Sequence, residues 1–181
     1  MSNFPDHTLE TAPEESRPFM ETTRQVYGMI PNLMAKMATS PAIAEAYLTV
    51  GGIFDKTSLT PVERQIVLLT VSHFNRCTYC VGAHSVIADM QEVPEEITNA
   101  IRNDVPIRDE KLQALRSFVV RMMDSRGWVS DDELDAFYAA GYGQEQVLDV
   151  IVGIAMKTMS NYTNHVAGTE LDEAFAHRAW S

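Results

Sequence analysis

The sequence predicts an all-α fold in a single domain. Its 181 residues suffice for one sizeable hydrophobic core, and 45% of them are apolar, as in ordinary globular proteins. Helix-start signals recur along the chain, and the apolar residues that follow them return at helical spacing. No run of residues alternates strictly between apolar and polar, as a half-buried β-strand would. We therefore expect helices joined by short turns.

The N-terminal third begins with a polar arm, residues 1–12, and residues 13–181 are expected to form the helical domain. Two glutamates directly after Pro13 suit the positive N-terminal end of a helix dipole. Glycines and prolines then divide this part of the chain into separate helices. The three predicted helices cover residues 14–27, 32–37 and 41–52.

The middle of the chain contains the clearest helix start. Thr60 can cap a helix, Pro61 fits its first position, and Glu63 completes a capping box. Apolar residues follow at helical spacing until a break that is expected near Arg76. The three predicted helices of this part cover residues 61–74, 77–90 and 94–102.

The last third is expected to contain the remaining helices. Residues 108–124 carry one apolar stripe, and Ser130 with Glu133 forms a second capping box. A helix over residues 144–161 is apolar around much of its circumference. Such a helix lies at the centre of a core or forms half of a subunit interface. The other predicted helices of this part cover residues 131–138 and 171–179.

The charge of the chain excludes some classes of partner. Its formal net charge is −11 and it has no cluster of Lys or Arg, so we expect no nucleic-acid or anionic membrane surface as partner. The first fifteen residues contain neither the basic nor the apolar segment of a secretory signal. The apolar stretch 147–156 is too short to span a bilayer. We expect a cytoplasmic protein whose thiols are kept reduced.

The two cysteines of the chain, Cys77 and Cys80, form a single C-x-x-C motif. The loop between them is too small to stabilise a fold much by a disulfide, so the pair points to chemistry. If Cys77 begins a helix, the helix dipole lowers its thiol pKa from about 8.5. His84 falls on the same helical face as both cysteines and can carry a proton. Together these groups suffice for a reversible dithiol–disulfide cycle.

Other interpretations of the motif stay open at this stage. The cysteines could be two buried core thiols, or they could bind zinc with His84 and His73. Structural zinc sites usually gather pairs of ligands from separate elements, and we predict neither a metal nor another cofactor. His73 lies on an apolar face, which favours a hydrogen-bonded core histidine. Tyr79, between the cysteines, either shields the site or only packs.

The motif and its surroundings resemble the alkylhydroperoxidase D-like, or carboxymuconolactone decarboxylase-like, superfamily. The resemblance rests on the C-x-x-C-x-x-x-H core, residues 77–84, and on the preceding residues 59–67 and 71–72. Residues 30–34 and 161–172 resemble the longer, peroxidase-related branch of the superfamily. This resemblance implies an alkylhydroperoxidase D-like helical fold and a homo-oligomer, often a trimer or hexamer. It also implies hydroperoxide reduction with electrons from a thiol or dithiol reductant protein.

The resemblance also implies roles for individual residues. It makes Cys80 the cysteine that attacks peroxide and Cys77 the resolving cysteine, and the spacing of His84 from Cys80 favours this order. The helix-terminus argument instead favours Cys77 as the more acidic thiol. The proton relay of the family uses a glutamate twelve residues before the first cysteine, where this chain has Gln65. Glu63 is about 200° away around the helix and cannot simply replace it.

The leading functional prediction is a thiol-dependent peroxidase or related dithiol oxidoreductase. Its catalytic residues would be Cys80, Cys77 and His84, with Gln65 orienting water or the histidine. Because Gln65 cannot ionise, efficient peroxide turnover is less expected than simple dithiol exchange. One alternative is a redox-sensing switch or binding protein without efficient turnover. Another is a carboxymuconolactone decarboxylase-like lyase, which is less expected because that branch typically lacks the cysteine pair.

Overall fold

The chain is all-α, as the sequence predicts. The computed structural model describes residues 4–181 and forms no strand within them, while residues 1–3 of the polar arm lie outside the described part. The α-helices are α1 (Arg17–Tyr27), α2 (Asn32–Met37), α3 (Pro41–Phe54), α4 (Pro61–Phe74), α5 (Thr78–Met90), α6 (Glu95–Arg102), α7 (Glu110–Asp124), α8 (Asp131–Ala139) and α9 (Gln144–Ala167). Two 3-10 helices, η1 (Glu14–Ser16) and η2 (Glu173–Arg178), lie near the two ends.

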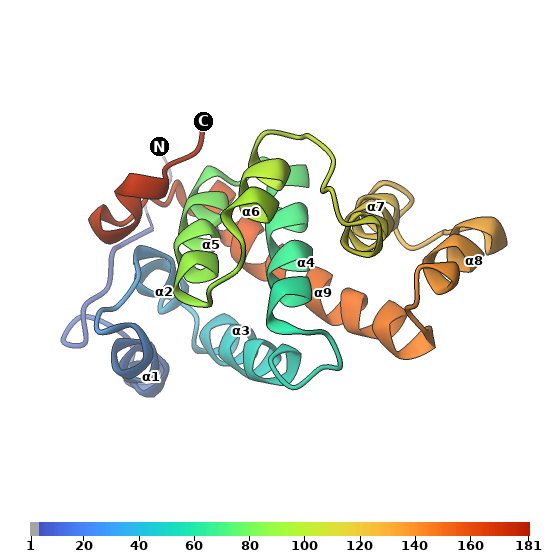
Figure 1. The fold of residues 1–181 in the computed structure, drawn as a ribbon. Coiled ribbons are helices and arrows are strands. Elements are labelled where there is room, and N and C mark those ends of the chain that lie inside the picture. Colours follow the sequence, from blue (N-terminus) through green and yellow to red (C-terminus); the bar gives the residue numbers. More distant parts are fainter. Residues whose placement is uncertain (1–3) are drawn as a thin grey trace.

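Helix α4 lies at the centre of the structure. It packs against α5, α6, α7 and α9, and Ile66, Val67 and Val71 on it have no exposed surface. Figure 1 shows α4 between α5 and α6 on one side and α7 on the other, with α9 passing along it. Helices α1 to α3 gather at one end of the molecule and α8 at the other. The helix that carries Gln65 is therefore held firmly on several sides.

Two hydrophobic clusters make up the core. The larger one lies among α4, α6, α7, α8 and α9. The second joins α1, α2 and α3 to the start of α5 and contains Cys77, Tyr79 and Cys80. The dithiol therefore lies inside the protein, between the N-terminal helices and the central helices.

The predicted helix starts are confirmed. The Thr60 side chain accepts a hydrogen bond from the Glu63 backbone, and the Glu63 carboxylate accepts one from the Thr60 backbone at 2.8 Å. Ser130 and Glu133 form the same reciprocal arrangement before α8. The predicted break between α4 and α5 is also present, because Arg76 adopts a left-handed backbone conformation with φ of 54°. This turn places Cys77 at the N-cap of α5.

Two helices are longer than the sequence predicted. Helix α3 continues through Gly51 to Phe54, since the missing side chain of Gly51 leaves room for Met156, whose Cε would lie 3.3 Å from a Cβ there. Helix α9 continues past Asn161 to Ala167 and ends where Gly168 turns left-handed. The polar residues near its end are buried against the cysteines and so do not mark a surface turn.

The polar arm lies against α2 within the described residues. The His7 backbone donates to the Ala35 carbonyl at 3.3 Å, and Lys36 Nζ donates to the Phe4 carbonyl at 2.8 Å. None of the helices described over residues 4–181 combines the length and the hydropathy needed to cross a membrane.

Candidate active site

The cysteine pair is buried at the start of α5. Cys77 is the N-cap residue and Cys80 lies in the first turn, and each side chain is 1% exposed. Both are free thiols. The backbone N–H of Cys77 donates to the Ser72 carbonyl at 2.9 Å, so the end of α4 fixes where α5 begins. The turn at residues 75–77 thus sets the position of both sulfurs.

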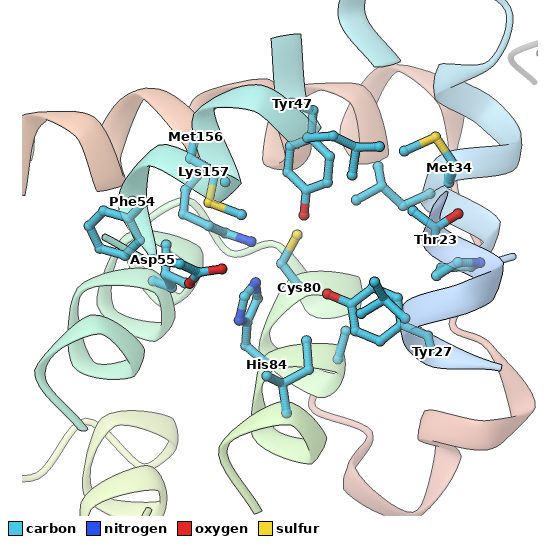
Figure 2. A pocket seen from close by; sticks show the side chains of 18 of the residues that line it. Thr23, Tyr27, Met34, Tyr47, Phe54, Asp55, Cys80, His84, Met156 and Lys157 are labelled. Carbon is cyan, nitrogen blue, oxygen red and sulfur yellow. The ribbon is translucent and has the colours of Figure 1, made fainter. Parts of the chain in front are cut away.

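A cavity of about 300 Å³ reaches Cys80. Its walls come from α1, α2, α3, α4, α5 and α9, and among residues 4–181 it is lined by Cys80 but not by Cys77. Figure 2 shows the Cys80 sulfur in the middle of this cavity, with His84 and Lys157 nearby. The aromatic side chains that line it are Tyr27, Tyr47, Tyr79, Phe54 and Phe175. A molecule in this cavity meets the second sulfur of the motif first.

Helix α9 presents polar groups to the two sulfurs. Asn164 Nδ2 lies 3.1 Å from Cys80 Sγ and 3.7 Å from Cys77 Sγ, and it can donate to either. Ser160 Oγ lies 3.8 Å from Cys80 Sγ. Burial by itself would raise the pKa of Cys80. The Cys77 thiol that donates to it, the Lys157 charge and the α9 side chains outweigh burial and hold this pKa well below its ordinary value.

The helix-terminus argument, which favours Cys77 as the more acidic thiol, is outweighed at this site, and the directions of the two pKa shifts agree with the other argument, which favours Cys80. The hydrogen bond of Cys77 to Cys80 is the largest cause that raises the pKa of Cys77, and burial raises it further. The N-cap position is as expected, but the local helix dipole is outweighed because Cys77 acts as the donor to its neighbour. Cys80 is therefore the more acidic thiol of the pair.

His84 and Gln65 are in direct contact. His84 Nδ1 lies 3.1 Å from Gln65 Oε1, and Gln65 Nε2 donates to Gln91 Oε1 at 3.1 Å. Because the amide nitrogen of Gln65 is already bound to Gln91, its oxygen faces the histidine and accepts from Nδ1–H. This assignment leaves Nε2 of His84 as the free acceptor. The structure thus brings together Cys80, His84 and Gln65 as the sequence predicted.

The imidazole of His84 is neutral at physiological pH. Burial is the larger cause and the positive charge of Lys157 the smaller, and together they hold the pKa of His84 well below its ordinary value. Gln65 cannot reverse this effect, because an amide has no charge with which to stabilise an imidazolium. His84 can therefore accept a proton but has none to spare beyond the one that it donates to Gln65.

Lys157 is the site residue that the sequence reasoning missed. Its side chain is fully buried, and within residues 4–181 its Nζ has no hydrogen-bond partner. In Figure 2 this nitrogen points toward the space between Cys80 and His84. A signal was present, since the polar residues of α9 recur at spacings of three and four and so share one face of an otherwise apolar helix. They are Lys157, Ser160, Asn161 and Asn164.

Tyr79 connects the motif to both ends of the chain. Its hydroxyl donates to Asp172 Oδ2 at 2.6 Å and accepts from the Leu33 backbone at 3.3 Å. Asp172 Oδ1 in turn accepts from the Asn32 backbone at 3.0 Å. The residue packs and braces the site, and its contacts join segments 30–34 and 161–172, which both resemble the peroxidase-related branch of the superfamily.

Glu63 and His73 lie outside the cavity lining. Glu63 holds its capping box and accepts from the Tyr142 hydroxyl at 3.0 Å, a structural role. His73 is not the hydrogen-bonded core residue that was expected, because its ring is partly exposed and packs against Trp180 at 5.1 Å between centroids. The zinc ligand set that included His73 is not assembled. Across residues 4–181, no three or more His, Cys, Asp or Glu side chains are grouped to hold a metal ion.

Comparison with known proteins finds one family match and several solved structures with the same helical fold. Residues 41–119 match the model of the carboxymuconolactone decarboxylase family. No curated protein sequence matches the chain. A peroxidase-related protein with an alkylhydroperoxidase AhpD core, from Ralstonia eutropha JMP134, superposes with a TM-score of 0.84 at 21% identity. The match covers 96% of this chain and 94% of that one.

Two further solved structures are similar. A peroxidase-related protein from Silicibacter sp. TM1040 gives a TM-score of 0.80 at 16% identity, over 96% of this chain and 92% of that one. The debrominase Bmp8, in a cysteine-to-alanine variant bound to 2,3,4-tribromopyrrole, gives a TM-score of 0.81 at 18% identity. The match covers 98% of this chain and 96% of that one. At these identities the likeness is one of fold. The family match over residues 41–119 and the shared helical fold both agree with the resemblance to the alkylhydroperoxidase D-like and carboxymuconolactone decarboxylase-like superfamily.

Proposed function

We propose that this chain is a thiol-dependent peroxidase, or a closely related dithiol oxidoreductase, that reduces hydroperoxides with Cys80 and Cys77. The observation that carries the proposal is the division of labour between the two sulfurs. Cys80 lines the cavity and its pKa is held well below the ordinary value, whereas Cys77 lies outside the lining and its pKa is raised. A nucleophile facing substrate, with a protonated partner beside it, is what a dithiol peroxidase needs.

The proposed cycle has three steps. The Cys80 thiolate attacks one peroxide oxygen, the O–O bond breaks, and the products are a sulfenic acid and an alcohol that has taken up a proton. The Cys77 thiol then attacks the Cys80 sulfur, and water leaves with the Cys77 proton as the disulfide forms. An external dithiol reduces this disulfide and regenerates the thiol and the thiolate.

His84 serves the proton transfers of the second and third steps in this proposal. Its free Nε2 can take a proton while Nδ1–H stays on Gln65 Oε1. Gln65 acts as a positioning residue, because it fixes the tautomer and the ring orientation through this bond. Asn164 Nδ2 donates to the thiolate in the reduced state and keeps the two sulfurs close together.

The partners follow from the chemistry and remain part of the proposal. A hydroperoxide is the oxidant and a thiol or dithiol protein the reductant, in the cytoplasm where such carriers stay reduced. A homo-oligomer, trimeric or hexameric, would cover exposed apolar residues on α9 that the core does not use. These residues are Leu148, Ile151, Tyr162 and Val166.

The test is a count of free thiols after the reduced protein meets a hydroperoxide. Wild type should lose two thiols and turn over when a dithiol is added. Cys77→Ser should consume one equivalent of peroxide and stop, whereas Cys80→Ser should consume none. If Cys80→Ser turned over peroxide as fast as wild type, the proposal would fail. Disulfide formation without turnover would identify a redox switch, and an activity that survived loss of both thiols would point to the lyase.

The shape of the cavity favours one second candidate, reductive dehalogenation of an aromatic ring. The cavity is larger than a small peroxide needs, and it is walled by aromatic and aliphatic side chains. Bmp8, which shares the fold, is a debrominase crystallised with 2,3,4-tribromopyrrole. The Cys80 thiolate would take the halogen, the carbon would take a proton, and Cys77 would release halide as the disulfide forms. Bromide release from 2,3,4-tribromopyrrole by the reduced wild type, and its absence in Cys80→Ser, would establish this activity.

A further inference from the structure

The proposed first step needs a proton that the dithiol cannot supply. When the Cys80 thiolate attacks a hydroperoxide, the departing oxygen leaves as an alkoxide unless a nearby acid protonates it. Cys77 keeps its own proton for the water that leaves in the second step. The donor must therefore be another group that lines the cavity beside Cys80. The side chains there that carry a transferable proton are His84, Tyr27, Tyr47 and Lys157. Burial raises the pKa of Tyr27 above its ordinary value and so makes it a poorer acid.

His84 does not fit this role. Its imidazole is neutral, since burial and the Lys157 charge hold its pKa well below the ordinary value. Its one N–H is donated to Gln65 Oε1 at 3.1 Å, so the nitrogen that remains free is an acceptor. A carboxylate at position 65 would have favoured an imidazolium, but the amide does not.

Tyr47 is a weaker candidate. In Figure 2 its hydroxyl points toward the Cys80 sulfur. Burial, and to a lesser degree the negative charge on Cys80, raise the pKa of Tyr47 above its ordinary value and so make it a poorer acid. Asp55, at the rim of the same cavity, is largely exposed and lies 3.9 Å from Arg64.

We propose that Lys157 is the general acid of the peroxide-reducing step and protonates the oxygen that leaves. This inference rests on the proposed function and adds a catalytic residue to it. The ammonium is fully buried in the cavity wall, lies beside the nucleophile, and has no hydrogen-bond partner within residues 4–181. Its N–H groups are therefore not committed to the protein and can bind the peroxide. The same charge stabilises the Cys80 thiolate before the reaction.

The atoms and charges balance over the cycle. Thiolate, hydroperoxide and ammonium become sulfenic acid, alcohol and neutral amine, so that no net charge is created in the cavity. Disulfide formation then releases water and changes neither Lys157 nor His84. The external dithiol supplies two electrons and two protons. One proton returns to Cys77 and the other to Lys157, while Cys80 is left again as a thiolate.

The test compares oxidants whose leaving groups differ in their need for a proton. The alkoxide that leaves tert-butyl hydroperoxide needs an acid, whereas the acetate that leaves peracetic acid does not. Single-turnover thiol loss is measured with both oxidants at a pH where Cys80 of each variant is ionised, as judged by its ultraviolet absorbance. We expect the rate of thiol loss in Lys157→Met to fall about 100-fold with tert-butyl hydroperoxide and to change little with peracetic acid. Lys111→Met, the same substitution outside the cavity, should match wild type with both oxidants.

Lys157→Arg provides a second variant if Lys157→Met folds poorly. A guanidinium keeps the positive charge but gives up a proton far less readily, so the thiolate should persist while the hydroperoxide reaction slows. Lys157→Met could instead react more slowly with both oxidants by the same factor, and the difference from wild type could disappear once Cys80 is equally ionised in both proteins. That result would show that Lys157 is only a counter-ion of the thiolate, and it would overturn the proposal. The proposal would also be overturned if Tyr47→Phe, and not Lys157→Met, reacted more slowly with tert-butyl hydroperoxide alone. If wild type lost no thiols to either oxidant, the proposed function itself would fall, and this inference with it.

Discussion

Replacing Gln65 with glutamate should turn the neutral His84 into a histidine that can hold a proton. The substitution places a carboxylate where the Gln65 amide oxygen now lies, 3.1 Å from His84 Nδ1. The hydrogen bond from Nδ1–H is kept, and the oxygen that accepts it gains a negative charge. An opposite charge this close favours the imidazolium, so the pKa of His84 should rise.

The size of this effect follows from the geometry. Two unit charges about 4 Å apart attract by about 4 kcal/mol at an effective dielectric constant of about 20, which equals about 3 pKa units. Two features of the site reduce the gain. Position 65 is 4% exposed, so the new carboxylate is costly to ionise, and the Lys157 charge still opposes the imidazolium. We therefore expect the pKa of His84 to rise by about 1 to 3 units.

Nuclear magnetic resonance of the histidine ring measures this pKa directly. The His84 signal is assigned by its loss in His84→Gln and followed by pH titration in wild type and Gln65→Glu. Gln91→Glu is the matched control, because it adds the same charge one hydrogen bond further from the histidine and at an exposed position. Its effect should be much smaller. An unchanged or lowered pKa of His84 in Gln65→Glu would show that this contact does not control the charge of the histidine.

Three further predictions concern stability and assembly. Because the pKa of Cys80 is lower in the folded chain than in the unfolded one, wild type should gain stability as pH rises toward about 8.5 and lose it as pH falls through the folded value. Urea unfolding of reduced Cys80→Ser should lack this part of the pH dependence. Gly153→Ala should cost about 1 to 3 kcal/mol, since its Cβ would lie 2.7 Å from Val67 Cγ1. Gly52→Ala, with open space around it, should stabilise by about 0.5 to 1 kcal/mol, and both are measured by thermal unfolding. Leu148→Glu, at a site 63% exposed on α9, should shift the expected oligomer toward monomer in sedimentation while a folded helix content persists.

The fold was predictable because its signals are local. Capping boxes and helical spacing depend on residues three or four apart, so Thr60 with Glu63 and Ser130 with Glu133 could be identified without a structure. The two misplaced ends, of α3 and α9, depend on contacts with other helices. Gly51 stays helical because Met156 packs on it, and the polar end of α9 stays helical because the cysteines are its partners. Neither contact is encoded near the residues that it affects.

The site was predictable to the extent that one helix carries it. Cys77, Cys80 and His84 share α5, and Gln65 was found at the position where the resemblance expects a glutamate. Lys157 lies seventy-three residues after His84 and enters the site only because α9 packs against α3, α4 and α5. The helix-terminus argument about the two thiols could not be weighed from the sequence for the same reason, since groups from α9 and the hydrogen bond between the sulfurs contribute to their relative acidity.

Gln65 and Lys157 are best understood together. In the family relay the residue at position 65 is a glutamate, which would put two negative groups, its carboxylate and the thiolate, into one buried site. This chain has a neutral amide there and a buried ammonium nearby, so that one positive charge faces one thiolate. A charge buried without an opposite charge nearby costs several kcal/mol. The ammonium of Lys157 and the thiolate of Cys80 compensate each other, and the ammonium is also an acid near the nucleophile. In the proposed mechanism, an amide in place of the glutamate changes the source of the proton and leaves the thiolate at Cys80 in place.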